Sequence, residues 1–488
     1  MGSKICRVVI VVVTGITVLT AATLVAAQTV PAPSSYRPAG TAQELELAGY
    51  AKILCSAVFV SGRDPAEATK NSGGNDKVAW HVNREQKLVR MTLGGVTREA
   101  RFYGDQGCII QRPDKPGIFF KPVTVTTTLP DAMSQPWPMG DRLPVEPLPS
   151  EVDRAKLDAA VEAAFDPAGL TAAFVVVYKG RLVAERYRPG ITKDTQLENW
   201  SMGKSLTGTL FALLIKDGTY TLEQPAPVPE WKAPGDPRGQ IRVMDLLRMS
   251  SGLRFVSPQD PDYAPDLGYP DHLYIYYGAV DVFEYSVNQP LEFPVNTQGR
   301  YRNCDPLTIG YLIKQAVTKR GEEYLTYPQR MLFDRIGIRR HVLETDPYGN
   351  FILSGYVYGT ARNWARLGLL YLQDGMWQGQ RLLPEGWATF VSTPAPTWRQ
   401  RYGGFFWLNR TRTFDLPEDA YYALGAGGQI MLVVPSRQLV VVRLGYSTGS
   451  HVGMRALNNA LGLVTGAIRK LGPTGRPDPS RGYQRTGS

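Results

Sequence analysis

A serine and a lysine stand three residues apart at the head of an apolar segment, in the stretch NWSMGKSLTG at 199–208. Residues at this spacing share one face of a helix, so Ser201 and Lys204 would face each other. A serine is a nucleophile only with a base beside it, and a lysine is such a base only when burial or nearby cations keep it neutral. The pair therefore predicts acyl transfer on Ser201, whereas a solvated Lys204 would mark only a helix start.

Tyr301 is the candidate proton carrier. It lies in GRYRNCDPLTIGYLI at 299–313, where Asp305 followed by a proline predicts a helix start with Asp305 as its cap. Tyr301 would then sit in a loop whose side chains can point into a cleft. A phenolate stabilised by Lys204 could take the Ser201 proton and return it to the leaving group. The alternative is that Tyr301 is one of 25 tyrosines and packs in the core.

Two further residues are candidates for binding the substrate. Asn303 completes a Tyr-x-Asn triplet with Tyr301 and could hold the lysine or a substrate carbonyl. A second triplet, 348–350, lies in a turn with no helix cap after it and is the weaker candidate. Trp200 precedes the serine and could line an apolar pocket, although it could equally be a core residue. The same two alternatives apply to Tyr402, Phe405, Phe406 and Trp407.

A glycine-rich run, LGAGGQ at 424–429, leads into an apolar strand. Glycines in this position let a ligand approach the backbone, which makes Gly425 and Gly427 candidate substrate contacts. The amide of Ala426 could join the amide of Ser201 as an oxyanion hole. The alternative is an ordinary turn or bulge at the start of a strand.

The order of these motifs resembles the serine β-lactamase and penicillin-binding superfamily. SMGK comes first, YRN follows about a hundred residues later, and the glycine-rich run lies near 425. The branch that it resembles most is class C-like and holds β-lactamase-related serine esterases and 6-aminohexanoate-dimer hydrolases. DLLRMSSGL at 245–253 is similar to the helix-to-loop signature of that branch. The resemblance extends over about residues 150–468.

The resemblance implies both a mechanism and a fold. Ser201 would be the acylated nucleophile, Lys204 its activator, Tyr301 the general acid and base, and the amides of Ser201 and Ala426 the oxyanion hole. The fold would be α+β and β-lactamase/transpeptidase-like, with an antiparallel sheet flanked by helices and a helical domain beside it. A small N-terminal α/β extension would be added to that fold.

The third motif departs from the pattern of the penicillin-processing members. Those carry Lys-Thr-Gly or a histidine variant, whereas 425–427 supplies no cation for a β-lactam carboxylate. Ser447–Gly449 resembles that motif but follows the wrong strand. The run resembles that of the nylon-oligomer hydrolases, so we expect a small-molecule ester or linear amide as substrate. Two alternatives remain, a peptidoglycan D-Ala-D-Ala carboxypeptidase or β-lactamase, and a catalytically inactive binding protein on the same fold.

The sequence also predicts the helices and strands that position these residues. A helix from Ser201 to about Asp217 carries leucines at helical spacing. Gly203 and Gly208 each cost about 1 kcal/mol inside a helix, so we expect another backbone to approach them. Three further elements are expected, namely hairpins over 171–187 and 429–446 and a helix over 454–470. The hairpins come from opposite ends of the large domain, which predicts one antiparallel sheet built from both.

The rest of the chain divides by composition. The expected parts are a signal peptide at 1–27, a linker at 28–40, a small α/β region at 41–128, a Pro-rich linker at 129–150, the hydrolase domain at 151–470 and a disordered basic tail at 471–488. An uncleaved membrane anchor is the alternative to the signal peptide. Export to the periplasm or medium favours a disulfide between Cys55 and Cys108, which leaves Cys304 free and buried.

Charge and composition exclude some functions. The formal net charge is +10, but the end of the chain from Arg469 holds five cations against one acid. A nucleic-acid role would need basic and aromatic residues interleaved on a folded face, and none is present. No Cys/His spacing predicts a metal, and no cofactor is expected. A membrane is a partner only if the signal is uncleaved, and the oligomeric state is unknown.

Overall fold

The structure is a computed structural model that describes residues 37–72 and 75–468. The predicted signal peptide and the predicted basic tail lie outside the described residues, as does most of the first linker. Within the described ranges, no helix combines the length and the apolar character that a membrane span requires.

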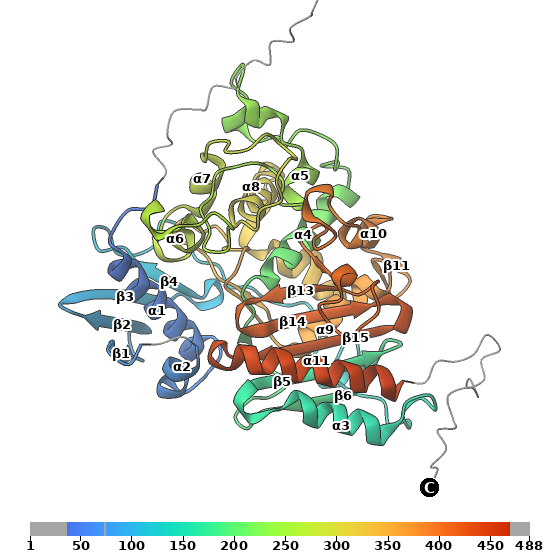
Figure 1. Ribbon diagram of the computed structural model, residues 1–488. Helices are drawn as coiled ribbons and strands as arrows, with labels where there is room; N and C mark the ends of the chain where they lie inside the picture. The colour runs from blue at the N-terminus through green and yellow to red at the C-terminus, as the bar shows by residue number, and fades with distance from the viewer. Residues whose placement is uncertain (1–36, 73–74, 469–488) are drawn as a thin grey trace, which may run out of the picture.

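A six-stranded antiparallel sheet forms the centre of the large domain, in the order β12-β13-β14-β15-β5-β6 (Figure 1). Its strands are β5 (Thr171–Tyr178), β6 (Arg181–Tyr187), β12 (Trp407–Leu408), β13 (Tyr421–Gly425), β14 (Gln429–Val434) and β15 (Leu439–Gly445). Both predicted hairpins are present, as β5–β6 and β14–β15. Strand β15 pairs with β5, so the two ends of the domain share one sheet as predicted.

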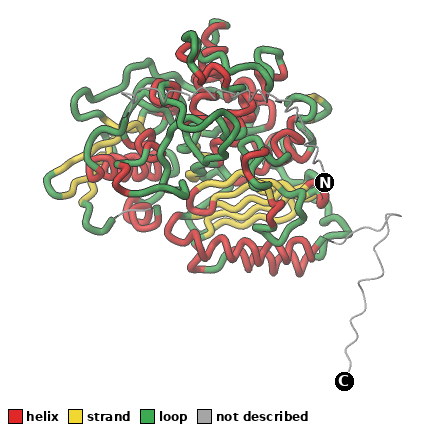
Figure 2. The backbone as a smooth tube through the Cα atoms, turned by 45° about the horizontal axis from the view of Figure 1, so that its top comes forward, coloured by secondary structure: helices red, strands yellow, loops and turns green. Residues whose placement is uncertain are grey.

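Helices cover both faces of this sheet (Figure 2). The helices α3 (Arg154–Ala164) and α11 (Ser450–Ala467) pack on one face, and α9 (Ala361–Leu372) packs on the other. Strand β5 is buried along its whole length because alternate side chains enter different cores. Val176 joins the core under α11, and Val175 joins the larger core that contains α9. Helix α11 begins four residues before the predicted start.

The helical part lies above the sheet in Figure 1, with α4 between the two. Its helices are α4 (Met202–Lys216), α5 (Val243–Leu247), α6 (Asp271–Tyr277), α7 (Val282–Val287) and α8 (Cys304–Lys319). Short elements complete the domain: β7 (Leu197–Glu198), β8 (Val342–Leu343), β9 (Val357–Gly359), β10 (Met376–Trp377), β11 (Gln380–Arg381) and α10 (Trp387–Ser392). The predicted fold class and the predicted helix after Ser201 are confirmed.

The predicted cap of α8 is wrong. Asn303 is the N-cap residue, and Asp305 lies inside the first turn. The Asp305 carboxylate instead accepts a hydrogen bond from Ser251 Oγ at 2.6 Å. Ser251, a buried residue from another segment, therefore binds the Asp305 oxygen that would otherwise cap the helix.

The N-terminal region packs a helical layer on its own antiparallel sheet. Its elements are α1 (Ala42–Phe59), α2 (Pro65–Asn71), β1 (Ala79–Asn83), β2 (Leu88–Leu93), β3 (Val96–Phe102) and β4 (Cys108–Gln111). The predicted disulfide between Cys55 and Cys108 is present and joins α1 to β4. Cys304 is free and buried, also as predicted.

Replacing both disulfide cysteines by alanine should lower the free energy of unfolding by about 4 kcal/mol, because the bridge closes a loop across 53 positions. Urea unfolding of the oxidised protein and of the double variant measures the difference. Cys304→Ala removes a buried thiol that closes no loop and serves as the matched control. Equal losses in the two variants would contradict the expectation.

A buried ion pair joins the N-terminal region to the large domain. Lys52 Nζ of α1 lies 2.6 Å from Glu344 Oε2, and the two side chains are at most 1% exposed. The other Glu344 oxygen accepts hydrogen bonds from Ser56 Oγ and from the Cys108 amide, each at 2.7 Å. The carboxylate thus has three donors, and all three come from the N-terminal region.

Residues of the predicted Pro-rich linker are fixed to the large domain. Arg366 of α9 donates hydrogen bonds to the carbonyls of Pro138 and Gly140 and to the Asp141 carboxylate, each at 2.7 Å. Arg339 donates to the Met139 carbonyl at 2.8 Å. This part of the segment is therefore a strap held by the buried guanidinium of Arg366 and the half-buried guanidinium of Arg339.

Candidate active site

A strained turn presents Ser201 at the start of α4. Asn199 ties the turn to β9, because its amide donates to the Val357 carbonyl at 2.9 Å and its Oδ1 accepts from the Gly359 amide at 2.7 Å. Trp200 follows with φ of 48°, a left-handed conformation that is costly for a tryptophan. Ser201 follows as the N-cap residue of α4 and is partly exposed.

Lys204 meets Ser201 from one turn further along the helix. Its Nζ lies 3.0 Å from Ser201 Oγ and donates to the Ser354 carbonyl at 2.8 Å. The side chain is 1% exposed, and none of the ion pairs among the described residues includes it. Burial lowers the Lys204 pKa well below the ordinary lysine value. The arrangement favours a neutral amine beside the hydroxyl.

The glycine before this lysine explains how Ser354 reaches it. A β-carbon at Gly203 would lie 2.8 Å from the Leu353 carbonyl oxygen, so only glycine lets α4 approach this segment. Close approach of a backbone was expected at Gly203 and is observed. Gly208 differs, because its nearest neighbour is the Phe405 side chain at 3.4 Å.

Tyr301 lies against the same amine. Lys204 Nζ is 4.7 Å from the centroid of the Tyr301 ring, and Trp407 packs on the ring at 5.3 Å. Burial raises the Tyr301 pKa above the ordinary phenol value, although a hydrogen bond with Ser201 acts in the opposite direction. The raised pKa favours the neutral phenol over the phenolate considered from the sequence.

The glycine-rich run touches the turn that carries the serine. A β-carbon at Gly425 would collide with the Asn199 carbonyl oxygen and would lie 3.2 Å from the Ser201 nitrogen. The missing side chain lets the end of β13 rest on this turn, so Ala426 follows directly beside Ser201. Gly427 adopts φ of 77°, which favours glycine in the turn that leads to β14.

A cavity of about 1090 Å³ opens at this point, between the end of β13 and α6. Five of the eight predicted catalytic, oxyanion-hole and substrate-binding residues line it: Trp200, Ser201, Tyr301, Gly425 and Ala426. Of the other predicted aromatic residues, Trp407 lines the cavity, whereas Tyr402, Phe405 and Phe406 are buried in the core. The wall combines aromatic side chains, which suit an apolar substrate group, with the charged side chains of Arg300, Arg399 and Arg401.

Lys204, Asn303 and Gly427 do not line the cavity. Asn303 is fully buried behind the wall, and its Nδ2 donates to the His272 carbonyl at 2.9 Å. The second Tyr-x-Asn triplet is elsewhere, because Tyr348 accepts from Arg112 and Asn350 accepts from Lys314.

Several wall residues carry no sequence motif. His272 of α6 is 7% exposed, and burial lowers its pKa well below the ordinary value, so the imidazole is neutral. Tyr277 also lines the cavity and packs against Gly49 of α1, which brings the N-terminal region to the back of the wall. A lone histidine or tyrosine in an apolar helix gives no signal before the helix is placed in space.

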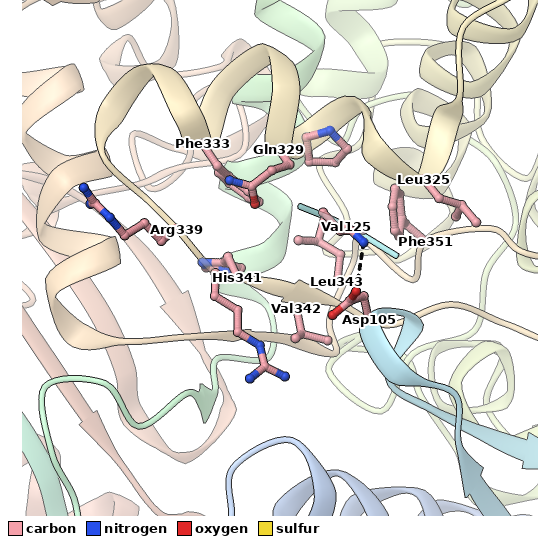
Figure 3. Close-up of a pocket in the computed structure, with 12 residues that line it drawn as sticks. Asp105, Val125, Leu325, Gln329, Phe333, Arg339, His341, Val342, Leu343 and Phe351 are labelled. Carbon is pink, nitrogen blue, oxygen red and sulfur yellow. Dashed lines mark hydrogen bonds between the residues drawn. The ribbon is translucent and has the colours of Figure 1, made fainter. Parts of the chain in front are cut away.

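A second, much smaller cavity lies where the N-terminal region meets the large domain (Figure 3). Its volume is about 30 Å³, and Asp105, Val125 and His341 are among its lining residues. Asp105 accepts a hydrogen bond from the Val125 amide at 2.8 Å. Burial lowers the His341 pKa to about 3. The space holds about one water molecule and is too small for a substrate.

Comparisons with known proteins find a family and a relative that match most of the large domain. Residues 157–465 match the Beta-lactamase family. The 6-aminohexanoate-dimer hydrolase of Paenarthrobacter ureafaciens is 24% identical over an alignment of 295 residues, which covers 56% of this chain and 72% of that protein.

Solved structures share the fold. A Bacillus anthracis protein described as a 6-aminohexanoate-dimer hydrolase has a TM-score of 0.52 at 21% identity, over 62% of this chain and 81% of its own. A penicillin-binding protein homologue from Caulobacter crescentus has a TM-score of 0.50 at 16% identity, over 64% and 98%. EstCE1, a hydrolase with promiscuous acyltransferase activity, has a TM-score of 0.50 at 13% identity, over 63% and 98%.

Proposed function

The chain belongs to the Beta-lactamase family, and we propose that it is an exported serine hydrolase that cleaves a small-molecule ester or linear amide through an acyl-enzyme on Ser201. The observation that carries this proposal is the 3.0 Å contact between the buried Lys204 amine and the Ser201 hydroxyl. A neutral amine at hydrogen-bond distance can take the proton as the oxygen attacks.

The contact between Lys204 and Ser201 and the directions of the two pKa shifts support the following order of proton transfers. Lys204 accepts the Ser201 proton as Oγ bonds to the substrate carbonyl carbon, and the oxyanion is stabilised by the amides of Ser201 and Ala426. The bond to the leaving group then breaks, and Tyr301 donates the proton that this group needs. The Lys204 ammonium reprotonates Tyr301. Water attacks the acyl group in the second half, loses its proton to this pair, and releases Ser201 with a proton.

The choice of substrate class follows from the cavity wall. Residues 425–427 supply no cation at the position where the penicillin-processing members carry theirs. Tryptophan and tyrosine side chains line the cavity, and Arg300, Arg399 and Arg401 line it as well. The relative from Paenarthrobacter ureafaciens is a 6-aminohexanoate-dimer hydrolase, which supports a linear amide. An ester satisfies the same geometry because its carbonyl carbon and leaving oxygen occupy the same positions. The disulfide supports an oxidising compartment.

The test is active-site labelling combined with turnover. The full chain should react with a fluorophosphonate probe and hydrolyse short p-nitrophenyl esters, and Ser201→Ala should lose both. Ser205→Ala is the matched control, because this buried serine of α4 bonds to the Phe405 carbonyl at 2.6 Å. It should keep labelling and turnover.

Two outcomes would replace the proposal. A folded wild-type protein that neither labels nor turns over any ester or amide would be a binding protein on a hydrolase fold. Stable acylation by a labelled penicillin, without ester turnover, would favour the peptidoglycan enzymes.

A further inference from the structure

Arg443 of β15 is a buried cation directly behind the glycine-rich turn. Its side chain is fully buried, and no ion pair of the described residues includes it. All its hydrogen bonds go to neutral oxygens. Nη1 donates to the carbonyls of Gly428 at 2.8 Å and Gly427 at 3.2 Å, while Nη2 donates to Gly169 at 2.8 Å and Nε to Thr171 Oγ1 at 3.1 Å.

Burying a charge in this position has a large free-energy cost. Removing a guanidinium from water without a counter-ion costs several kcal/mol before hydrogen bonds offset it. Burial lowers the Arg443 pKa to about 10, so the group keeps its charge at neutral pH. A methionine or leucine would fill the space without this penalty. Filling space therefore does not account for an arginine at this position, whereas its hydrogen bonds could.

Glycines form the socket that holds the guanidinium. A β-carbon at Gly428 would lie 2.8 Å from Nη1, one at Gly445 would lie 2.6 Å from Nη2, and one at Gly453 of α11 would collide with Nη2. The socket therefore joins three separate elements around one side chain. A side chain at any of these three glycines would occupy the space of the guanidinium.

The socket holds the turn between Ala426 and Gly428. Gly427 and Gly428 have φ of 77° and 72°, a left-handed pair that gives the turn little support of its own. Arg443 binds the carbonyls of both residues. The next residue is also clamped, because Gln429 Nε2 donates to the Gly445 carbonyl at 2.7 Å and its Oε1 accepts from the Gly445 amide at 2.8 Å.

We propose that Arg443 is a positioning residue that fixes the Ala426–Gly428 turn so that the Ala426 amide stays aimed at the developing oxyanion. The inference rests on the proposed function for its catalytic consequence, but not for the ordering of the turn. If the Ala426 amide is displaced by a fraction of an ångström, it stabilises the transition state less well, whereas binding of the substrate is little affected.

Arg443→Met and Arg443→Lys test the inference in the full-length enzyme. Loss of one oxyanion donor costs about 10²–10³ in kcat, and a loosened donor should cost less, about tenfold to a hundredfold, with KM nearly unchanged. A lysine keeps the charge but lacks the forked donors, so Arg443→Lys should also lose activity. The affinity of a boronic acid that mimics the tetrahedral state should fall in parallel with kcat/KM.

Arg366→Met is the matched control. Arg366 is also a buried arginine that donates to two backbone carbonyls, but those belong to the strap at 138–140, and unlike Arg443 it is paired with a carboxylate, that of Asp141. Its loss should lower the melting temperature and leave kcat and boronate affinity per folded molecule unchanged. Gly453→Ala is a complementary variant. Its methyl group should displace the Arg443 guanidinium without removing it, so the variant should also lose kcat.

Hydrogen exchange separates this inference from the proposed function. Amides of 426–428 should exchange faster in Arg443→Lys than in the wild type, and not in Arg366→Met. If the wild-type protein is inert toward every substrate but Arg443→Lys shows faster exchange at 426–428, the proposed function is wrong and the positioning role of Arg443 stands. Unchanged kcat, boronate affinity and exchange in folded Arg443→Met would overturn the positioning role, as would a loss confined to KM.

Discussion

Lys204→Met should abolish turnover and at the same time change how the stability of the protein depends on pH. Without its base the Ser201 hydroxyl keeps its proton, and removal of one member of such a unit costs at least about 10⁴-fold in kcat. Fluorophosphonate labelling should slow in the same proportion. The serine itself remains in place, so the loss reports the amine alone.

The stability change follows from the depressed Lys204 pKa. Below the folded pKa both states hold the proton, and above the unfolded pKa neither does. Between the two, the unfolded chain binds a proton that the folded enzyme lacks. The free energy of unfolding of the wild type should therefore rise with pH in this window, relative to Lys204→Met, by up to about 1.4 kcal/mol per pH unit. Urea titrations at several pH values measure the slope.

Lys52→Met is the control for this experiment. Lys52 is equally buried but is paired with Glu344 at 2.6 Å. Its removal leaves a buried carboxylate without its counter-ion, so the variant should lose about 3–5 kcal/mol. If wild type and Lys204→Met instead keep parallel stability curves across pH, the amine is charged in the folded enzyme and cannot be the base.

Tyr301→Phe should show a loss of kcat that depends on the leaving group. General acid catalysis contributes about 10²–10⁴-fold, and it is needed most where the departing atom is strongly basic. An amide or an alkyl ester should suffer the full loss. A p-nitrophenyl ester should suffer far less during acylation, because p-nitrophenolate leaves without a proton.

Tyr402→Phe is the matched control, because Tyr402 is a buried phenol whose ring packs edge-on against Tyr301 at 6.2 Å. It should keep near-normal kcat for both kinds of substrate. Pre-steady-state bursts separate acylation from deacylation. An equal loss for amide and p-nitrophenyl ester acylation in Tyr301→Phe would assign Tyr301 to another role.

Features encoded by local spacing could be predicted from the sequence. The helix that starts after Ser201 and the hairpins β5–β6 and β14–β15 depend on periodicity and turn residues. The proximity of Ser201 and Lys204 follows from helix geometry alone. The disulfide pairing followed from the expected compartment and from the small number of cysteines available.

Features that depend on contacts between distant segments could not be predicted. The Ser354 carbonyl reaches Lys204 across 150 positions, and the socket of Arg443 joins segments as far apart as 274 positions. The sequence around Asp305 predicts a helix cap, because it contains no information about the distant Ser251 that binds the carboxylate. Asn303 lies behind His272 for the same reason. Charge states were also hidden, because burial raises the Tyr301 pKa and the sequence does not reveal burial.

The ion pair between Lys52 and Glu344 has a consequence for how this protein could be shortened. A gene trimmed to the family-matching portion would encode a polypeptide whose Glu344 has lost every donor named above. That carboxylate would have to take up a proton or open a path for solvent beside Tyr356, whose ring receives Lys52 at 4.4 Å and touches Trp200 at 5.0 Å. The N-terminal extension and the large domain should therefore be produced together, because separating them leaves a buried carboxylate without its partners.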